Sequence, residues 1–177
     1  MAWIRQRLRQ LKLLVFDVDG VLTDGGLSYG PDGQIGRRFS ARDGLAMKLL
    51  QEAGLQLAWI SGGRGESIAR RAQDLGIAHC FAEVNNKSAV LNGLQQKLGH
   101  SAPETAFVGD DLNDLVVRPH VGLLITPVDA ARPVRRQADL VLRSSGGQGA
   151  VRELAERILR ARCQWAELER CGWRQRN

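Results

Sequence analysis

The chain has 177 residues, a formal net charge of +6, 44% hydrophobic residues and 25% charged residues. This length suits one domain with a sizeable core and is too short for two ordinary domains. Because no apolar run approaches a membrane span and the N-terminal stretch lacks a signal-peptide core, we expect a cytoplasmic protein without membrane contact. The 3 cysteines are widely spaced, with no histidine cluster nearby, which argues against disulfides and structural zinc.

The positive charge comes mainly from arginines at the two ends of the chain. Such a charge suits an anionic partner, for example nucleic acid, an acidic surface or a phosphorylated small molecule. Glutamates alternate with the C-terminal arginines at helical spacing, however, and this pattern favours a solvated helix face. We therefore expect a small phosphorylated ligand and no nucleic-acid partner.

Short apolar runs predict the strands of a buried parallel sheet, because they are too short for helices and do not alternate with polar residues. These runs are residues 11–16, 55–60, 105–109, 121–126 and 138–142. Helical periodicity predicts helices between them, at residues 44–54, 65–76, 86–99 and 129–137. The alternation predicts an α/β fold, a Rossmann-like open parallel sheet with helices on both faces.

Two segments interrupt this alternation. Residues 24–40 contain a Pro-Asp-Gly turn between two short arms, which predicts a small β-hairpin after the first strand. Residues 144–177 read as a Gly-rich loop, one long terminal helix and a tail. Since we find no repeat, linker or separate cap domain, we predict that residues 1–177 form a single domain.

Polar residues follow the predicted strands at the edge where parallel sheets bind ligands. Asp17 follows the first strand, Ser61 the second and Asp110 the third, and Lys87 stands at the start of a predicted helix. We therefore expect carboxylates, a hydroxyl group and an ammonium group to converge on one edge of the sheet.

This combination suits phosphoryl transfer to a carboxylate. Asp17 can attack phosphorus only if its charge and that of the phosphate are neutralised, so we expect Mg²⁺ bound by Asp17 and Asp110. Asp17 would become an aspartyl phosphate. Asp19 points to the same side of an extended chain, so it can protonate the leaving oxygen and later take a proton from water.

Phosphate contacts are expected from the second strand and from the lysine. Ser61 and the backbone amides of Gly62 and Gly63 can hold the phosphoryl oxygens, while Lys87 can stabilise the charge on phosphate and nucleophile together.

Asp111 and Asp114 follow Asp110 and are interpreted as supporting residues, because each suits a helix cap as well as a catalytic role. A lone DxD or GDD would be weak support for catalysis. Four elements in order at strand ends form a much more specific signal.

The motifs "FDVDGVLTDG", "ISGG", Lys87 and "VGDDLND" resemble those of the haloacid dehalogenase superfamily, and the resemblance covers most of the chain. The segment "DGGLSYGPDGQIGRRFSARDGLAMKLLQEAG" and the terminal "GGQGAVREL" look like those of capless sugar-acid phosphatases within it. The resemblance implies Asp17 as nucleophile and metal ligand, Asp110 as metal ligand, and Asp19 as acid/base that also binds the metal through its carbonyl.

The same resemblance implies a substrate, the 8-phosphate of 3-deoxy-D-manno-octulosonate. Two alternatives stay open: a phosphatase of a nine-carbon sialic-acid-type 9-phosphate or another small phosphometabolite, and a basic binding module that has lost catalysis. One departure affects specificity, because such phosphatases have arginine directly after the Gly of the second motif. Here Gly63 holds that position and Arg64 is shifted by one, while Arg71 does align as a substrate contact.

The resemblance also implies a homotetramer, and the missing cap gives it a physical reason. Without a lid, water and other phosphorylated compounds would enter the site freely. Neighbouring subunits can supply the cover, with the hairpins closing into a shared barrel and the tail reaching an adjacent site.

Overall fold

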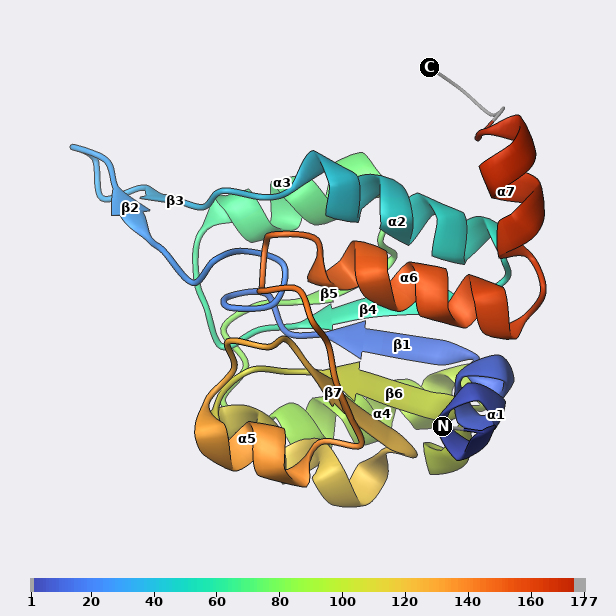
Figure 1. Cartoon of the computed structure of the whole chain (residues 1–177). Coiled ribbons are helices and arrows are strands. Elements are labelled where there is room, and N and C mark those ends of the chain that lie inside the picture. Colours follow the sequence, from blue (N-terminus) through green and yellow to red (C-terminus); the bar gives the residue numbers. More distant parts are fainter. Residues whose placement is uncertain (1, 174–177) are drawn as a thin grey trace.

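The computed structural model describes residues 2–173, and its central feature is a parallel sheet with strands in the order β5-β4-β1-β6-β7-β8 (Figure 1). The strands are β1 (Leu13–Phe16), β4 (Gln56–Ile60), β5 (His79–Phe81), β6 (Thr105–Val108), β7 (Leu123–Thr126) and β8 (Leu140–Val141). The predicted Rossmann-like sheet is therefore confirmed. Its order places β1 between β4 and β6, so the ends of all three strands meet at one edge.

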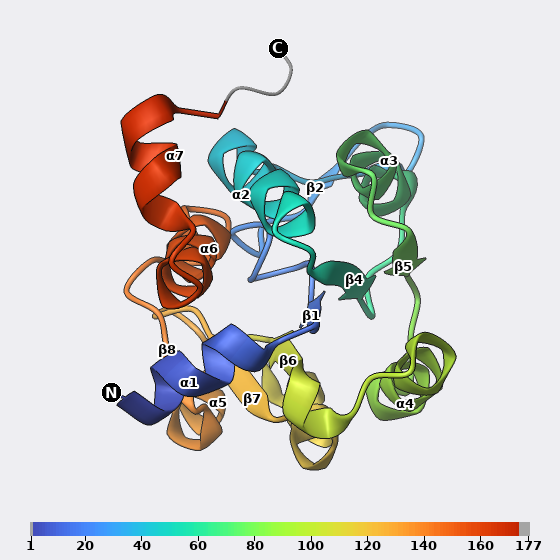
Figure 2. The same cartoon turned by 90° about the vertical axis from the view of Figure 1, so that its right-hand side faces the viewer.

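Helices cover both faces of the sheet (Figure 2). One face carries α2 (Ala41–Glu52), α3 (Glu66–Leu75) and α6 (Ala150–Ala161), and the other carries α4 (Lys87–Leu98), α5 (Arg132–Gln137) and the 3₁₀ segment η2 (Leu112–His120). Two further elements are α1 (Ala2–Gln10), which packs against α6, and the 3₁₀ turn η1 (Ala102–Glu104). None of the helices in the described part of the chain has the length and apolar content needed to span a bilayer.

The alternating direction of side chains in β1 explains why this strand is apolar throughout. Leu14 and Phe16 belong to the core cluster shared with α2, α3 and α6, whereas Leu13 and Val15 belong to the cluster shared with α4 and η2. All four side chains are fully buried. A strand covered on both faces has no polar side, so it reads as a continuous apolar run.

The predicted hairpin is present as β2 (Ser28–Tyr29) and β3 (Ile35–Gly36), paired antiparallel. It projects from the body of the protein beside α3 (Figure 1). In the part of the chain that the structure describes, the segment between β1 and α2 contains this hairpin and no cap domain.

The terminal helix differs from the prediction, because it is broken into α6 and α7 (Trp165–Cys171). The break lies at Cys163, which adopts a left-handed conformation (φ 60°) that ends α6. Trp165 is then buried against Leu49 and Leu159, and the indole nitrogen of Trp173 donates to the Glu52 carboxylate at 2.8 Å. The tail therefore packs on its own chain as far as Trp173, and the rest of the predicted tail, 174–177, lies outside the described residues.

Candidate active site

The predicted polar residues converge at the carboxyl edge of the sheet. Asp17 directly follows β1, Ser61 follows β4, Asp110 lies two residues beyond β6, and Lys87 is the first residue of α4. Asn86 caps α4 by accepting a hydrogen bond from the amide of the third helical residue at 3.0 Å, which sets where the helix begins and therefore where Lys87 lies.

Lys87 forms the buried centre of the site. Its Nζ lies 3.0 Å from Oδ1 of Asp17 and 2.6 Å from Oδ1 of Asp114. The Lys87 side chain is only 3% exposed, and that of Asp114 is fully buried. Burial alone would lower the pKa of Lys87, but the carboxylates of Asp17 and Asp114 outweigh it and raise the pKa. Lys87 is therefore a permanent cation at this edge.

Asp17, Asp110 and Asp114 bring three carboxylates together around this single ammonium group. One oxygen of each lies within 4.8 Å of the others. Burial, followed by repulsion from Asp114, raises the pKa of Asp17 to about 7. Burial, followed by repulsion from Asp17 and Asp114, raises the pKa of Asp110 to about 8. When all three carboxylates are ionised, the cluster carries more negative charge than Lys87 neutralises.

The cluster fits a hard divalent cation. Among the described residues, Oδ1 of Asp17 and Oδ1 of Asp110 are buried without a hydrogen-bond donor, apart from the ion pair of Asp17 with Lys87. Unpaired buried carboxylate oxygens are the ligands that Mg²⁺ takes. Gly20 permits this packing, because its φ is 83° and a Cβ there would overlap the Asp110 carboxylate.

Asp114 has a larger place in the site than its sequence position indicates. Its Oδ1 contacts Lys87, while its Oδ2 accepts hydrogen bonds from the amides of Asp110 at 2.9 Å and Asp111 at 3.3 Å. It therefore orients the loop that carries Asp110. Asp111, by contrast, is exposed and caps η2 through a 2.7 Å bond from the Leu112 amide.

The loop after β4 is held by its own hydrogen bonds. Ser61 is 1% exposed, and its amide donates to the Phe81 carbonyl at 2.8 Å. The Ser61 hydroxyl accepts a bond from the Gly63 amide at 3.0 Å. Gly62 is exposed at the turn. The Gly63 amide would have to leave the Ser61 hydroxyl before it could bind a phosphoryl oxygen.

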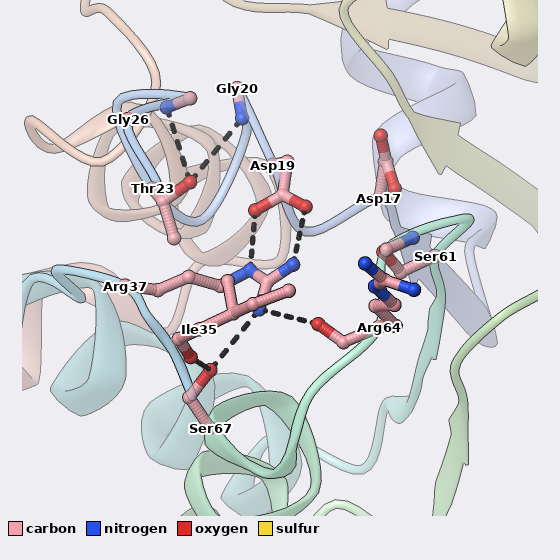
Figure 3. A network of polar contacts seen from close by, with 12 residues as sticks. Asp17, Asp19, Gly20, Thr23, Gly26, Ile35, Arg37, Ser61, Arg64 and Ser67 are labelled. Atoms are coloured by element: carbon pink, nitrogen blue, oxygen red, sulfur yellow. Dashed lines mark hydrogen bonds and ion pairs between the residues drawn. The ribbon is translucent and has the colours of Figure 1, made fainter. Parts of the chain in front are cut away.

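Asp19 lies outside the three-acid cluster, and its carboxylate faces Arg37, a residue that the sequence interpretation missed (Figure 3). Arg37 follows β3 at the base of the hairpin, and its side chain is 1% exposed. It donates from Nε to Oδ1 of Asp19 at 2.7 Å and from Nη2 to Oδ2 at 3.0 Å. The sequence signal for Arg37 is weak, because "GRRFS" contains two adjacent arginines and no spacing rule distinguishes them.

The two predicted substrate arginines have different surroundings. Arg64 is exposed and lines a pocket of about 500 Å³ between the hairpin and α3. Arg71 is half-buried, with its guanidinium 5.9 Å from the centre of the Phe39 ring and a 3.4 Å bond to the Ser40 carbonyl. Arg64 is therefore accessible to a ligand from solvent, whereas Arg71 is engaged with the start of α2. Their roles toward substrate stay predictions.

Known proteins are similar to this chain in sequence and in fold. No protein-family model matches the chain. The chain is 39% identical over 158 residues to 3-deoxy-D-manno-octulosonate 8-phosphate phosphatase KdsC of Haemophilus influenzae, covering 89% of this chain and 88% of that protein. It is 36% identical over 155 residues to KdsC of Escherichia coli K12, covering 88% of this chain and 82% of the relative.

Solved structures of phosphatases with this name are also similar to the chain. The phosphatase of the same name from Moraxella catarrhalis, in complex with magnesium, phosphate and the sugar acid KDO, superposes with a TM-score of 0.92 at 35% identity, covering 96% of this chain and 98% of that one. The cobalt-bound Haemophilus influenzae enzyme gives a TM-score of 0.89 at 37% identity, covering 93% and 96%. The chain therefore belongs to the 3-deoxy-D-manno-octulosonate 8-phosphate phosphatase family of the haloacid dehalogenase superfamily.

Proposed function

We propose that this chain is a Mg²⁺-dependent phosphatase that converts 3-deoxy-D-manno-octulosonate 8-phosphate to the free sugar acid and phosphate through an aspartyl phosphate at Asp17. The observation that carries this proposal is the buried contact of Lys87 with Asp17 and Asp114, beside Asp110. The relatives' names and the magnesium, phosphate and KDO in the Moraxella complex support the same substrate class.

The proposed reaction has two steps. In the first, a carboxylate oxygen of Asp17 attacks phosphorus, the bond from phosphorus to the sugar oxygen breaks, and Asp19 gives that oxygen a proton. In the second, water attacks phosphorus, Asp19 takes a proton from this water, and the bond to Asp17 breaks to release phosphate. The two steps leave both aspartates as they began.

Other residues stabilise the charge that develops. A bound Mg²⁺ would be held by Asp17, Asp110 and the carbonyl of Asp19, and would supply positive charge for the attack on phosphate. Lys87 keeps Asp17 oriented and offsets part of the charge that remains on it. The Ser61 hydroxyl, in the loop after β4, can donate a hydrogen bond to a phosphoryl oxygen.

Substrate choice is tested by phosphate release from a panel of sugar-acid phosphates, with and without Mg²⁺. We expect the highest kcat/KM for the eight-carbon 8-phosphate and loss of turnover in EDTA. A higher kcat/KM for a nine-carbon 9-phosphate would favour that sugar as the substrate and would suggest that the shifted Arg64 contacts it. Absence of phosphate release, together with a steeply salt-dependent affinity for DNA, would favour the binding module instead.

We also propose that the protein forms a homotetramer through its hairpin. The projecting hairpin exposes Leu27 by 43% and Tyr29 by 67%, which is more apolar surface than a solvent-facing turn needs. Light scattering that gives a monomer in solution would contradict this proposal.

Metal-free protein should lose stability as the pH rises through the range in which the acidic cluster ionises. The folded-state pKa values of Asp17 and Asp110, about 7 and about 8, lie above the ordinary value of 3.8. The folded state therefore holds protons that the unfolded state has released, so the free energy of unfolding falls between about pH 4 and about pH 8. Mg²⁺ requires the ionised carboxylates, and its stabilisation should grow over the same range.

Thermal unfolding in EDTA and in excess Mg²⁺ measures how the stability and its increase by Mg²⁺ depend on pH. At Mg²⁺ about 100-fold above Kd we expect a Tm increase of roughly 5–10 °C near pH 8 and a much smaller one near pH 5. Asp110→Asn should remove most of this increase, while Asp24→Asn, at an exposed ion pair with Arg38, should retain it. An increase that does not change with pH would contradict the raised pKa values.

A further inference from the structure

We propose that Arg37 is a positioning residue for Asp19, and that Gly63 is required because it leaves room for their contact. This inference rests on the proposed function, since it concerns the acid/base group of that reaction. Arg37 and Asp19 form a bidentate pair, with both carboxylate oxygens bound at 2.7 and 3.0 Å. A planar guanidinium fixes the plane of a carboxylate, whereas a single donor leaves it free to rotate.

Each of the three guanidinium nitrogens of Arg37 donates at least one hydrogen bond. Its Nη1 donates to the Arg64 carbonyl at 2.9 Å and to the Ser67 hydroxyl at 3.2 Å. The Ser67 hydroxyl in turn donates to the Ile35 carbonyl at 3.0 Å, beside Arg37 in the hairpin. One side chain thus joins the loop after β1, the hairpin, the loop after β4 and the start of α3 (Figure 3). Asp19 is oriented by a rigid support and not by a flexible surface arginine.

Gly63 completes this arrangement. A Cβ at Gly63 would lie 2.6 Å from Nη2 of Arg37 and 2.6 Å from Oδ2 of Asp19. Both atoms belong to side chains and not to the backbone, so a larger residue would push the two side chains apart without disrupting the backbone. The guanidinium of Arg37 therefore lies beside the Gly63 position, where a side chain would otherwise stand.

The contact occupies only one side of the Asp19 carboxyl group. A carboxylate offers about four lone-pair positions, and the guanidinium uses two of them. The Asp19 side chain remains 28% exposed, whereas that of Arg37 is 1% exposed, so Asp19 is open on the side away from Arg37. Proton transfer is sensitive to small displacements of the acid, and orientation is what Arg37 contributes.

The test compares leaving groups, because only a poor one needs a proton. A sugar alkoxide must be protonated as it leaves, whereas p-nitrophenolate leaves without help. For Arg37→Ala we expect kcat/KM, which reports the steps up to the phosphoenzyme, to fall about 10- to 100-fold on the sugar phosphate and far less on p-nitrophenyl phosphate. Guanidinium ion at a non-denaturing concentration should restore part of kcat/KM, and Arg37→Lys should restore less than the full value because it lacks the planar fork.

Matched variants separate this role from folding. Arg38→Ala is the control, because Arg38 is the adjacent residue, is 78% exposed and pairs with Asp24 on the surface. It should leave both activities unchanged. Gly63→Ala should reproduce the leaving-group pattern of Arg37→Ala while retaining Arg37. It replaces Arg37→Ala as the test variant if Arg37→Ala folds poorly.

Equal losses of kcat/KM on both substrates, or no loss in either variant, would overturn the positioning role. The proposed function fails separately: wild-type protein that hydrolyses another alkyl phosphate but not the eight-carbon 8-phosphate overturns the substrate alone, and the leaving-group comparison is then made with the accepted compound. Wild-type protein that hydrolyses no phosphomonoester overturns both.

Discussion

Asp17→Asn is expected to abolish turnover, with a fall in kcat of at least about 10⁴-fold and no phosphoenzyme that can be trapped. Asparagine has nearly the same shape, so the site keeps its packing, but its amide is a poor nucleophile toward phosphorus. Phosphate release measures turnover, and mass spectrometry of acid-quenched protein detects a phosphoryl group on the wild-type chain. Both signals should be absent from the variant.

The loss should not come from unfolding. Asp17 is one of three clustered carboxylates, and repulsion from Asp114 is among the causes of its raised pKa. Removing its charge should leave the metal-free Tm unchanged or raise it. Asp24→Asn, at an exposed aspartate paired with Arg38, should keep full activity. Near-wild-type turnover by Asp17→Asn would mean that another group attacks phosphorus.

The sheet could be predicted largely because its strands are buried on both faces. Such strands leave a continuous apolar run, and the runs that the sequence predicts correspond to β1, β4, β6, β7 and β8. Strand β5 was not predicted because it is only His79–Phe81, half-buried at the edge of the sheet, where no long apolar run is needed. The break before α7 was also missed, because Cys163 adopts a positive φ that no neighbouring Gly or Pro indicates.

The approach of Asp17, Ser61, Lys87 and Asp110 could be predicted because it depends only on strand direction. Parallel strands end at the same edge, so residues that follow them meet whatever their sequence separation. The contact between Asp19 and Arg37 depends instead on how a hairpin folds back over the loop after β1. Hydrophobic periodicity does not indicate how a hairpin folds back over a loop, so the contact of Arg37 with Asp19 was found only in the structure.

Asp114 illustrates a second limit of the sequence. Its position after "GDD" suits a helix cap, and it does form the capping box of η2 with Asp111. The same carboxylate also contacts Lys87 with its other oxygen, which the spacing alone does not indicate. A capping residue can thus orient the Asp110 loop and the lysine together.

Lys87→Met is expected to have the other large effect, on stability as well as activity. Lys87 is the ammonium group that contacts Asp17 and Asp114, and both side chains are buried. Losing one partner of a buried ion pair leaves an uncompensated charge and costs about 3–5 kcal/mol of the free energy of unfolding. Loss of a positive group beside the reacting phosphate should lower kcat by about 10²- to 10³-fold.

The stability loss should depend on pH and Mg²⁺ if it is electrostatic. Without Lys87 the folded-state pKa values of Asp17 and Asp110 rise above about 7 and about 8, so the folded protein takes up protons and recovers stability as the pH falls from above about 8. Mg²⁺ at about pH 8 supplies the missing positive charge and should recover part of the lost free energy of unfolding. Urea unfolding of Lys87→Met and of the exposed control Lys12→Met, at about pH 6 and pH 8 with and without Mg²⁺, measures these changes. A loss that is the same under all four conditions would mean that Lys87 contributes packing and not charge.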